Sequence, residues 1–442
     1  MSKDKAMLNA FDPSRVSELA EADRALVARR QQLLTPAYRL FYDEPLHIVR
    51  GEGVWLYDNT GRAYLDAYNN VASVGHCRPE VVEAIARQAS VLNTHTRYLH
   101  DGVLNYAERL LATFPSALSQ AMFTCTGSEA NDLALRIARR HTGAEGVIVT
   151  RLAYHGVTTA IAEISPSLGK AVPLSPAVRA VPPPDAYRED AATVGQRFAH
   201  AVREACDDLL RHGIRPAALI VDTLFTSDGV FADPAGFLRE AVEVIRAAGG
   251  VFIADEVQAG FARTGSCMWG FQRHDLVPDI VTMGKPMGNG HPIAGVVARP
   301  EVVEAFGREA RYFNTFGGNP VSCAAALAVL DVIENDRLQA NAARIGAQLR
   351  EGFRALGHRH DLIGDVRGDG LFLGVELVRD RATLAPATAE AAHVVNTMRR
   401  HGVLISTTGI LGNVLKIRPL LPFTSDNADL LLQTADEALR SV

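Results

Sequence analysis

The 442-residue sequence is unusually poor in lysine. Only five lysines occur (Lys3, Lys5, Lys170, Lys285 and Lys416), and arginine supplies the other 40 basic side chains. Arginine stays protonated in proteins, whereas a buried lysine can lose its proton and attack a carbonyl carbon. Lys285 lies in the glycine-rich stretch "IVTMGKPMGNG" (280–290), which suggests amine chemistry. The alternative is an ordinary surface lysine that follows a strand.

Other features are absent, and each absence excludes a class of protein. The five cysteines are far apart and form no Cys-x-x-Cys pair, which predicts reduced thiols and no zinc site. No apolar run approaches the length of a membrane span, and the first residues lack the apolar segment of a signal peptide. A net charge of −5 gives no reason to expect nucleic acid. We therefore expect a cytoplasmic protein without a nucleic-acid partner, a membrane partner or a bound metal.

Short apolar runs alternate with helical patterns through the middle of the chain. The runs cover 121–124, 146–150, 217–222, 250–255, 279–283 and 293–298. Such runs, bounded by turn residues, are typical of a mostly parallel sheet with helices on both faces. Before them the pattern predicts a helix over 14–33 and a β-hairpin within 54–68, and after about 330 it becomes α+β. We predict an N-terminal segment (1–75) that belongs to a small domain, a large α/β domain (76–325) and the remainder of the small domain (326–442).

Two polar stretches follow the earlier strands of this pattern. Gly127 and Ser128 stand where the strand at 121–124 turns into a helix, and the free N–H groups of a helix N-terminus suit a phosphate. The alternative is an ordinary helix cap formed by Ser128. Tyr154 stands near Gly156 after the strand at 146–150, where an aromatic ring could stack on a flat ligand.

Two later strands end in residues that complete a recognisable set. Asp255 ends an apolar strand, and a buried carboxylate needs a partner such as a protonated pyridine nitrogen. Gln258 could reach a ring hydroxyl, and Lys285 follows the next strand. Because parallel strands end at one edge of a sheet, these residues can face one pocket. A phosphate site, a stacking ring, a pyridinium partner and an amine together match pyridoxal 5′-phosphate.

Other classes fit the sequence poorly. A Walker phosphate loop needs glycine at position 279 and serine or threonine at 286, where this chain has Asp279 and Pro286. The glycines of 364–374 lead into a strand and not a helix, which argues against a dinucleotide-binding fold. A metal site in "GHCRPE" would have no second cluster to complete it, so we interpret that stretch as a loop lining the substrate pocket.

Five stretches resemble the class-III (omega) aminotransferases of pyridoxal-phosphate fold type I, in the family's order and spacing. They are "TGSEANDLALRIAR", "AYHG", "FIADEVQAGFARTG", "VTMGKPMGNG" and "FNTFGGNPVSCAAALAVL". The resemblance implies a large domain with a mostly parallel seven-stranded sheet, a smaller α+β domain and a homodimer with active sites at its interface. It also implies site residues. Lys285 would form the Schiff base, Asp255 would face the ring nitrogen, and the other cofactor-binding residues would be Gly127, Ser128, Tyr154, His155, Asp222, Val257, Gln258 and, from the second subunit, Thr315.

Some stretches resemble one branch of the family more particularly, the phospholyases of ethanolamine phosphate and phosphohydroxylysine. These are "LDAYNNVASVGHCRPEVV", "LNTHTRYLHD", "GKPMGNGHP" and "NPVSCAAALAVLDVIEN". Many glutamate-using members have a Glu-Pro-x-Gln-Gly-Glu-like stretch whose last glutamate holds an arginine aside. Here the stretch reads "VDTLFTSDG", with Asp222 in the first acidic place and Ser227 in the last. That feature therefore looks absent.

We therefore expect elimination of phosphate and ammonia from a small amino-phosphate such as ethanolamine phosphate. The alternative is an omega-aminotransferase that moves an amino group from an amine to a keto acid such as pyruvate. Arg418 in "VLKIRPLL" resembles the family's substrate arginine, and a guanidinium suits a carboxylate, a phosphate or a structural ion pair. The candidates for binding the substrate's anionic group are Asn70, His95, Arg97 and Arg418.

Overall fold

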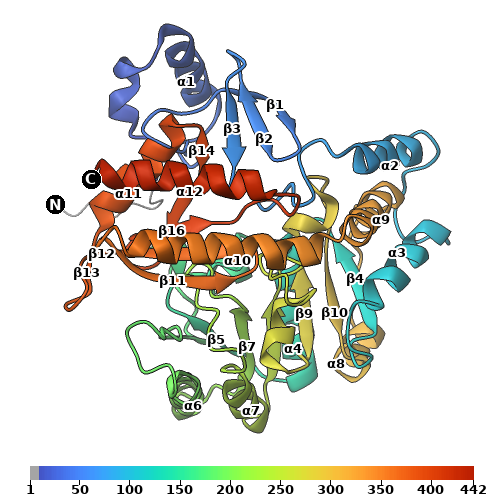
Figure 1. The fold of residues 1–442 in the computed structure, drawn as a ribbon. Helices are drawn as coiled ribbons and strands as arrows, with labels where there is room; N and C mark the ends of the chain where they lie inside the picture. The colour runs from blue at the N-terminus through green and yellow to red at the C-terminus, as the bar shows by residue number, and fades with distance from the viewer. Residues whose placement is uncertain (1–8) are drawn as a thin grey trace.

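The computed structural model describes residues 9–442, and its centre is a seven-stranded sheet (Figure 1). The strand order is β4-β10-β9-β8-β7-β5-β6. The bounds are β4 (Gln120–Thr124), β5 (Gly146–Thr150), β6 (Val178–Val181), β7 (Pro216–Asp222), β8 (Val251–Asp255), β9 (Ile280–Met283) and β10 (Ala294–Ala298). The six apolar runs of the sequence thus become six of these strands, while β6 has no counterpart among them.

The sheet is mostly parallel, as the sequence predicted. β6, β5, β7, β8 and β9 pair in parallel, and β10 runs antiparallel to both of its neighbours, β9 and β4. Every residue of β5, β8, β9 and β10 is buried. Strands buried on both faces have continuous apolar sequences, which explains why these runs could be recognised.

Helices cover both faces of this sheet. On one face α4 (Gly127–Thr142) packs against β7–β10 and α8 (Pro300–Glu309) packs on α4; on the other, α6 (Val194–Arg211) and α7 (Arg239–Ala247) pack together against β5–β8. α4 begins with a reciprocal cap between Thr126 and Glu129. This cap fixes where the helix starts, one residue before the glycine and serine expected to bind phosphate.

The N-terminal segment contains the expected hairpin and an interrupted helix. β2 (Trp55–Asp58) and β3 (Ala63–Asp66) pair antiparallel, and β1 (Ile48–Glu52) extends them. The expected helix over 14–33 is instead a 3-10 helix, η1 (Pro13–Glu18), and a separate helix, α1 (Glu21–Leu33). Leu19 is extended between the two and packs with Phe11 and Val27, and this contact breaks the helix.

The two ends of the chain share structure. β14 (Val403–Leu404) pairs in parallel with β3, so the N-terminal hairpin lies beside the C-terminal helices at the top of Figure 1. A further sheet follows the order β11-β12-β16-β15, with β13 paired to β12. Its strands are β11 (Ile363–Asp369), β12 (Phe372–Asp380), β13 (Ala385–Pro386), β15 (Ser406–Thr408) and β16 (Val414–Ile417). The division into domains at 75 and 325 stays a proposal, which the β3–β14 pairing favours.

The other elements connect or cover these sheets. They are α2 (Pro79–Ala89), α3 (Asp101–Leu111), α5 (Thr159–Ala162), α9 (Pro320–Asn335), α10 (Leu338–Gly357), α11 (Thr388–Arg400), α12 (Ser425–Arg440), η2 (Pro166–Leu168), η3 (Gly270–His274) and η4 (Lys285–Gly288). Over residues 9–442, none of the helices has the length and apolar character needed to cross a membrane.

Glu256, immediately after β8, fastens the end of that strand to its surroundings. Its carboxylate is fully buried and accepts hydrogen bonds from the backbone N–H groups of Gly270 (2.7 Å) and Phe271 (2.8 Å) and from the Thr223 hydroxyl (2.9 Å). Burial raises the pKa of Glu256 to about 7. This carboxylate ties the segments after β7 and β8 to η3.

We expect Glu256→Ala to destabilise the fold by about 3 kcal/mol, because it leaves buried donors without acceptors. Thermal unfolding of the purified protein should show a lower melting temperature. Glu240→Ala is the control, since Glu240 is exposed on α7 and its loss should change stability by at most about 0.5 kcal/mol. Equal melting temperatures for the two variants would contradict a structural role for Glu256.

Candidate functional site

The ends of five strands (β4, β5, β7, β8 and β9) and the segments that follow them surround one cavity of about 270 Å³. Asp222, Asp255 and Thr282 stand side by side at the ends of β7, β8 and β9, as the strand register requires. The cavity is lined by Val71, Cys125, Thr126, Gly127, Ser128, Asn131, Tyr154, His155, Gly156, Asp222, Asp255, Val257, Gln258, Lys285, Gly290, His291, Pro292 and Ile293. The structure therefore brings together all the expected cofactor-binding residues except Thr315.

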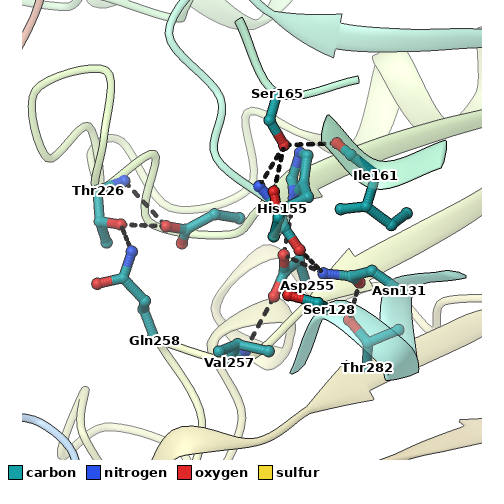
Figure 2. A network of polar contacts seen from close by, with 12 residues as sticks. Ser128, Asn131, His155, Ile161, Ser165, Thr226, Asp255, Val257, Gln258 and Thr282 are labelled. Carbon is teal, nitrogen blue, oxygen red and sulfur yellow. Dashed lines mark hydrogen bonds and ion pairs between the residues drawn. The ribbon is translucent and has the colours of Figure 1, made fainter. Parts of the chain in front are cut away.

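Asp255 is the centre of a buried polar network (Figure 2). One carboxylate oxygen accepts hydrogen bonds from Asn131 Nδ2 (3.0 Å) and is 2.7 Å from His155 Nδ1. The other accepts the backbone N–H of Val257 (3.1 Å). Asn131 is held in turn by the Thr282 hydroxyl, which donates to its side-chain oxygen (2.6 Å). These contacts fix the orientation of the carboxylate at the cavity wall and supply the partners that its burial demands.

The N-terminus of α4 offers hydrogen-bond donors to the same cavity. Thr126 Oγ1 accepts the N–H of Glu129 (3.2 Å), and the Glu129 carboxylate accepts those of Cys125 and Thr126. Within the described part of the chain, the N–H groups of Gly127 and Ser128 have no acceptor. Two free donors at the positive end of a helix form an anion site.

Glycines keep this anion site open. Gly156 has a φ of 136°, and a Cβ there would overlap Ser128 Oγ and come within 2.8 Å of Ser128 Cβ. A Cβ on Gly127 would come within 3.1 Å of Val257, so these two residues already pack closely. The Ser128 hydroxyl accepts the N–H of Val157 (3.1 Å), which joins the segment after Tyr154 to the helix N-terminus. Only glycine at 156 permits this approach.

Lys285 begins η4 directly after β9 and extends into the cavity, where solvent reaches it. Its ammonium lies 6.0 Å from the centre of the Tyr154 ring. Burial lowers the pKa of Lys285, the charge of Arg418 lowers it further, and Asp255 and Asp222 oppose the shift. A larger fraction of this lysine is therefore neutral, and so nucleophilic, than of a free lysine at the same pH.

Asp222 organises the loop that follows β7. Its carboxylate accepts the backbone N–H groups of Leu224 (3.0 Å) and Thr226 (3.1 Å) and the Thr226 hydroxyl. Burial raises the pKa of Asp222. Gln258 donates its side-chain N–H to the Thr226 hydroxyl, as Figure 2 shows, so the loop is joined to the segment after β8.

The four candidates for the substrate's anion lie outside the cavity lining. Arg418 is buried and donates to the Tyr68 carbonyl and to Gln258 Oε1 (both 2.6 Å). Asn70 is buried, and its side-chain N–H group has no partner in residues 9–442. His95 and Arg97 instead contact Phe313, the histidine edge-on and the guanidinium 3.8 Å from the ring centre. A substrate role for all four stays a prediction.

Thr315 is exposed and also lies outside this cavity, so its role as a ligand from a second subunit stays a prediction. The sequence reasoning missed Asn131, although it lies one helical turn beyond Gly127 on α4, a spacing that could have indicated a shared face. Across residues 9–442, the structure groups no three histidine, cysteine or acidic side chains suited to a metal ion.

The cavity fits pyridoxal phosphate. It has an anion site at a helix N-terminus, a carboxylate held by three contacts and a lysine near an aromatic ring. Val257, against Gly127, and Tyr154 give it nonpolar surface. These are the groups that a phosphorylated pyridine aldehyde requires.

Comparisons with known proteins agree with this fit. The family model "Aminotransferase class-III" matches residues 41–439. A protein of Drosophila melanogaster named "Alanine--glyoxylate aminotransferase 2-like" is 44% identical, over 93% of this chain and 86% of its own length. "Ethanolamine-phosphate phospho-lyase homolog 1" of Caenorhabditis elegans is 36% identical, over 94% and 93%. Some relatives are named as mitochondrial, so the cytoplasmic location stays a prediction.

A solved structure is similar over nearly the whole chain. It is a phospholyase from Arthrobacter in complex with phosphoethanolamine, 45% identical, with a TM-score of 0.92. The match covers 94% of this chain and 100% of the Arthrobacter chain.

We expect Gly156→Ala to weaken binding of pyridoxal phosphate at least about tenfold, because the added methyl group overlaps Ser128 at the anion site. Titration of the apoprotein, followed by cofactor absorbance, measures this. Gly169→Ala is the matched control, since Gly169 also has a positive φ (83°) but a Cβ there meets nothing within 4 Å. If the two variants bind the cofactor equally well, the site is not where we place it.

We expect the apoprotein to recombine with pyridoxal phosphate faster as pH rises, with a midpoint below that of Nα-acetyl-lysine reacting with the same aldehyde. The reason is that only the neutral amine attacks the aldehyde and the pKa of Lys285 is lowered. Stopped-flow absorbance over a pH series measures both midpoints. A midpoint at or above that of the free amine would contradict the lowered pKa.

Proposed function

Because the chain belongs to the class-III aminotransferase family of pyridoxal-phosphate-dependent enzymes, we propose that it eliminates phosphate and ammonia from a small amino-phosphate such as ethanolamine phosphate. The observation that carries the proposal is the similarity to the Arthrobacter phospholyase, which was solved with phosphoethanolamine. The branch-like stretches around Asn70, His95 and Lys285 support the same choice.

The chain's own residues divide between holding the cofactor and acting on the substrate. Gly127 and Ser128 would hold the cofactor phosphate at the start of α4, and Asp255 would supply a fixed negative charge to the ring nitrogen. When bound, pyridoxal phosphate withdraws electrons from the carbon that bears the substrate's amino group. Tyr154 and Val257 supply surfaces for the ring.

Lys285 is the base of the reaction. Its neutral amine accepts a proton from the carbon bearing the amino group, and its lowered pKa increases the fraction of that amine that is neutral at a given pH. In the substrate, the C–O bond at the next carbon then breaks, and its electron pair leaves with the phosphate oxygen. A carbon–carbon double bond forms, and hydrolysis by one water gives acetaldehyde and ammonia.

The active form in this proposal is a homodimer. Thr315 is exposed, as are Phe313 and Phe316 beside it, with 41% and 68% of their surfaces accessible. A second subunit packed there would cover these rings and receive Thr315 as a ligand for the cofactor phosphate. The cluster of His95, Arg97 and Phe313 would then lie at the interface.

The second candidate function is omega-aminotransferase activity. It is favoured by the relatives that carry alanine–glyoxylate aminotransferase names at similar identity. Against it, Arg418 is paired with Gln258 and a backbone carbonyl, and position 227 holds serine where many glutamate-using members carry an acidic residue. The charged pair that serves two alternating substrates in those members therefore has no counterpart here.

The deciding experiment supplies the purified holoenzyme with ethanolamine phosphate and no keto acid. We expect phosphate, ammonia and acetaldehyde to appear in equal amounts, because elimination needs no amino acceptor. Colorimetric phosphate and enzyme-coupled ammonia assays measure the release. Lys285→Ala is the control and should lose at least about 100-fold of the rate, since it removes the base.

Turnover that begins only after pyruvate, glyoxylate or 2-oxoglutarate is added would overturn the elimination proposal and favour aminotransfer. An unchanged rate for Lys285→Ala would contradict the assignment of the base under either function.

A further inference from the structure

Lys416 is a second buried lysine close to the cavity. It lies on β16, opposite Gly374 of β12 and Ser406 of β15, with only 8% of its surface exposed. Within residues 9–442, its ammonium forms no hydrogen bond or ion pair, and it lies 5.6 Å from the centre of the Phe372 ring. A buried ammonium without a hydrogen-bonded partner is costly, so its retention requires a reason beyond folding.

Lys416 is not itself a lining residue, but it projects from the same face of β16 as Arg418, which contacts Gln258 in the cavity lining. The Thr408 hydroxyl of β15 donates to the Thr226 carbonyl (2.8 Å), and the backbone N–H of Gly409 donates to the Ser227 carbonyl (3.2 Å). The loop after β7 begins with Asp222, which lines the cavity. Burial and the charges of Arg418 and Lys285 lower the pKa of Lys416, while Asp222 opposes the shift. The ammonium therefore lies within electrostatic range of two residues that face the ligand.

Arg418 provides the contrast. It stands two residues further along, and its guanidinium lies 5.8 Å from the same Phe372 ring. Its Nε donates to the Tyr68 carbonyl, and Nη1 donates to Gln258 Oε1. The backbone N–H of Arg418 donates to the Ala67 carbonyl (2.8 Å). Arg418 thus joins the loop after β3 to the segment after β8. Of the two cations, Arg418 forms two side-chain hydrogen bonds and Lys416 forms none among the described residues.

We propose that Lys416 is a specificity-determining residue that binds the phosphate group of the substrate. This rests on the proposed function, in which the substrate is a phosphate ester of an amino alcohol. A dianionic phosphate offsets the repulsion among Lys416, Lys285 and Arg418, and an ammonium–phosphate hydrogen bond is charge-assisted on both sides. Asn70 is a candidate neutral donor to the same phosphate, because its buried side-chain N–H group has no partner among the described residues.

The test measures binding without turnover. Ethyl phosphate keeps the phosphate of the substrate but lacks the amine, so calorimetric titration into the holoenzyme reports the phosphate contact alone. We expect Lys416→Gln to weaken ethyl phosphate binding at least tenfold and Lys416→Arg to stay within about threefold of the parent, because a charged donor is lost in the first and kept in the second. Lys170→Gln, which removes an exposed lysine, should change nothing.

Two further measurements separate this role from a structural one. Lys416→Met should melt at or above the temperature of the parent, since it removes an uncompensated buried charge. With ethanolamine phosphate, Lys416→Gln should raise KM more than it lowers kcat.

Equal ethyl phosphate affinities for the parent and Lys416→Gln would overturn the proposal, whichever reaction the enzyme catalyses. So would a parent enzyme that binds propionate but not ethyl phosphate, because the cation would then serve a carboxylate. If Lys416→Gln loses ethyl phosphate binding and Lys170→Gln keeps it, the role of Lys416 is supported even when the elimination assay fails. Failure of the Lys416 proposal is therefore distinguishable from failure of the elimination proposal.

Discussion

The carboxylate of Asp255 is the interaction on which the site depends. It stands at the end of a fully buried strand, where a charge is tolerated only if donors surround it. Those donors come from three separate segments: Asn131 from α4, His155 from the loop after β5, and the backbone of Val257. Together with the Thr282 hydroxyl that donates to Asn131, this buried carboxylate fixes the start of α4 relative to β9, the strand that precedes Lys285.

Groups of both charge signs lie at or near the cavity. Asp222, Asp255 and Lys285 line it, and the charges of Arg418 and Asp222 act on both Lys285 and Lys416. In the proposed function the aspartates and Lys285 serve the cofactor, and the substrate meets the cations beyond them. Differences between elimination and aminotransfer are then to be sought in which of these cations are paired with protein atoms and which are left for a ligand.

Sequence patterns predicted the central strands well because burial on both faces leaves a continuous apolar run that is visible without any tertiary information. Gly127, Ser128, Asp255 and Lys285 could be identified for a related reason: each directly follows such a run, and parallel strands end at one edge. The interruption between η1 and α1 could not be predicted, because it depends on Leu19 packing against Phe11 and Val27. β6 has a short and only partly buried sequence, which gave no strong pattern.

The sequence by itself determined the chemistry available at the strand ends: a lysine, an aspartate and a glycine-serine turn in the order that a vitamin B6 enzyme needs. It indicated Arg418 as a candidate for the substrate's anion and passed over Lys416, two residues earlier in "VLKIRPLL". Only the tertiary structure revealed how the two differ, by bringing the Tyr68 carbonyl and Gln258 to Arg418 and leaving Lys416 without a partner among the described residues. The physical reason is that pairing of a buried charge depends on segments hundreds of residues away, which no local pattern records.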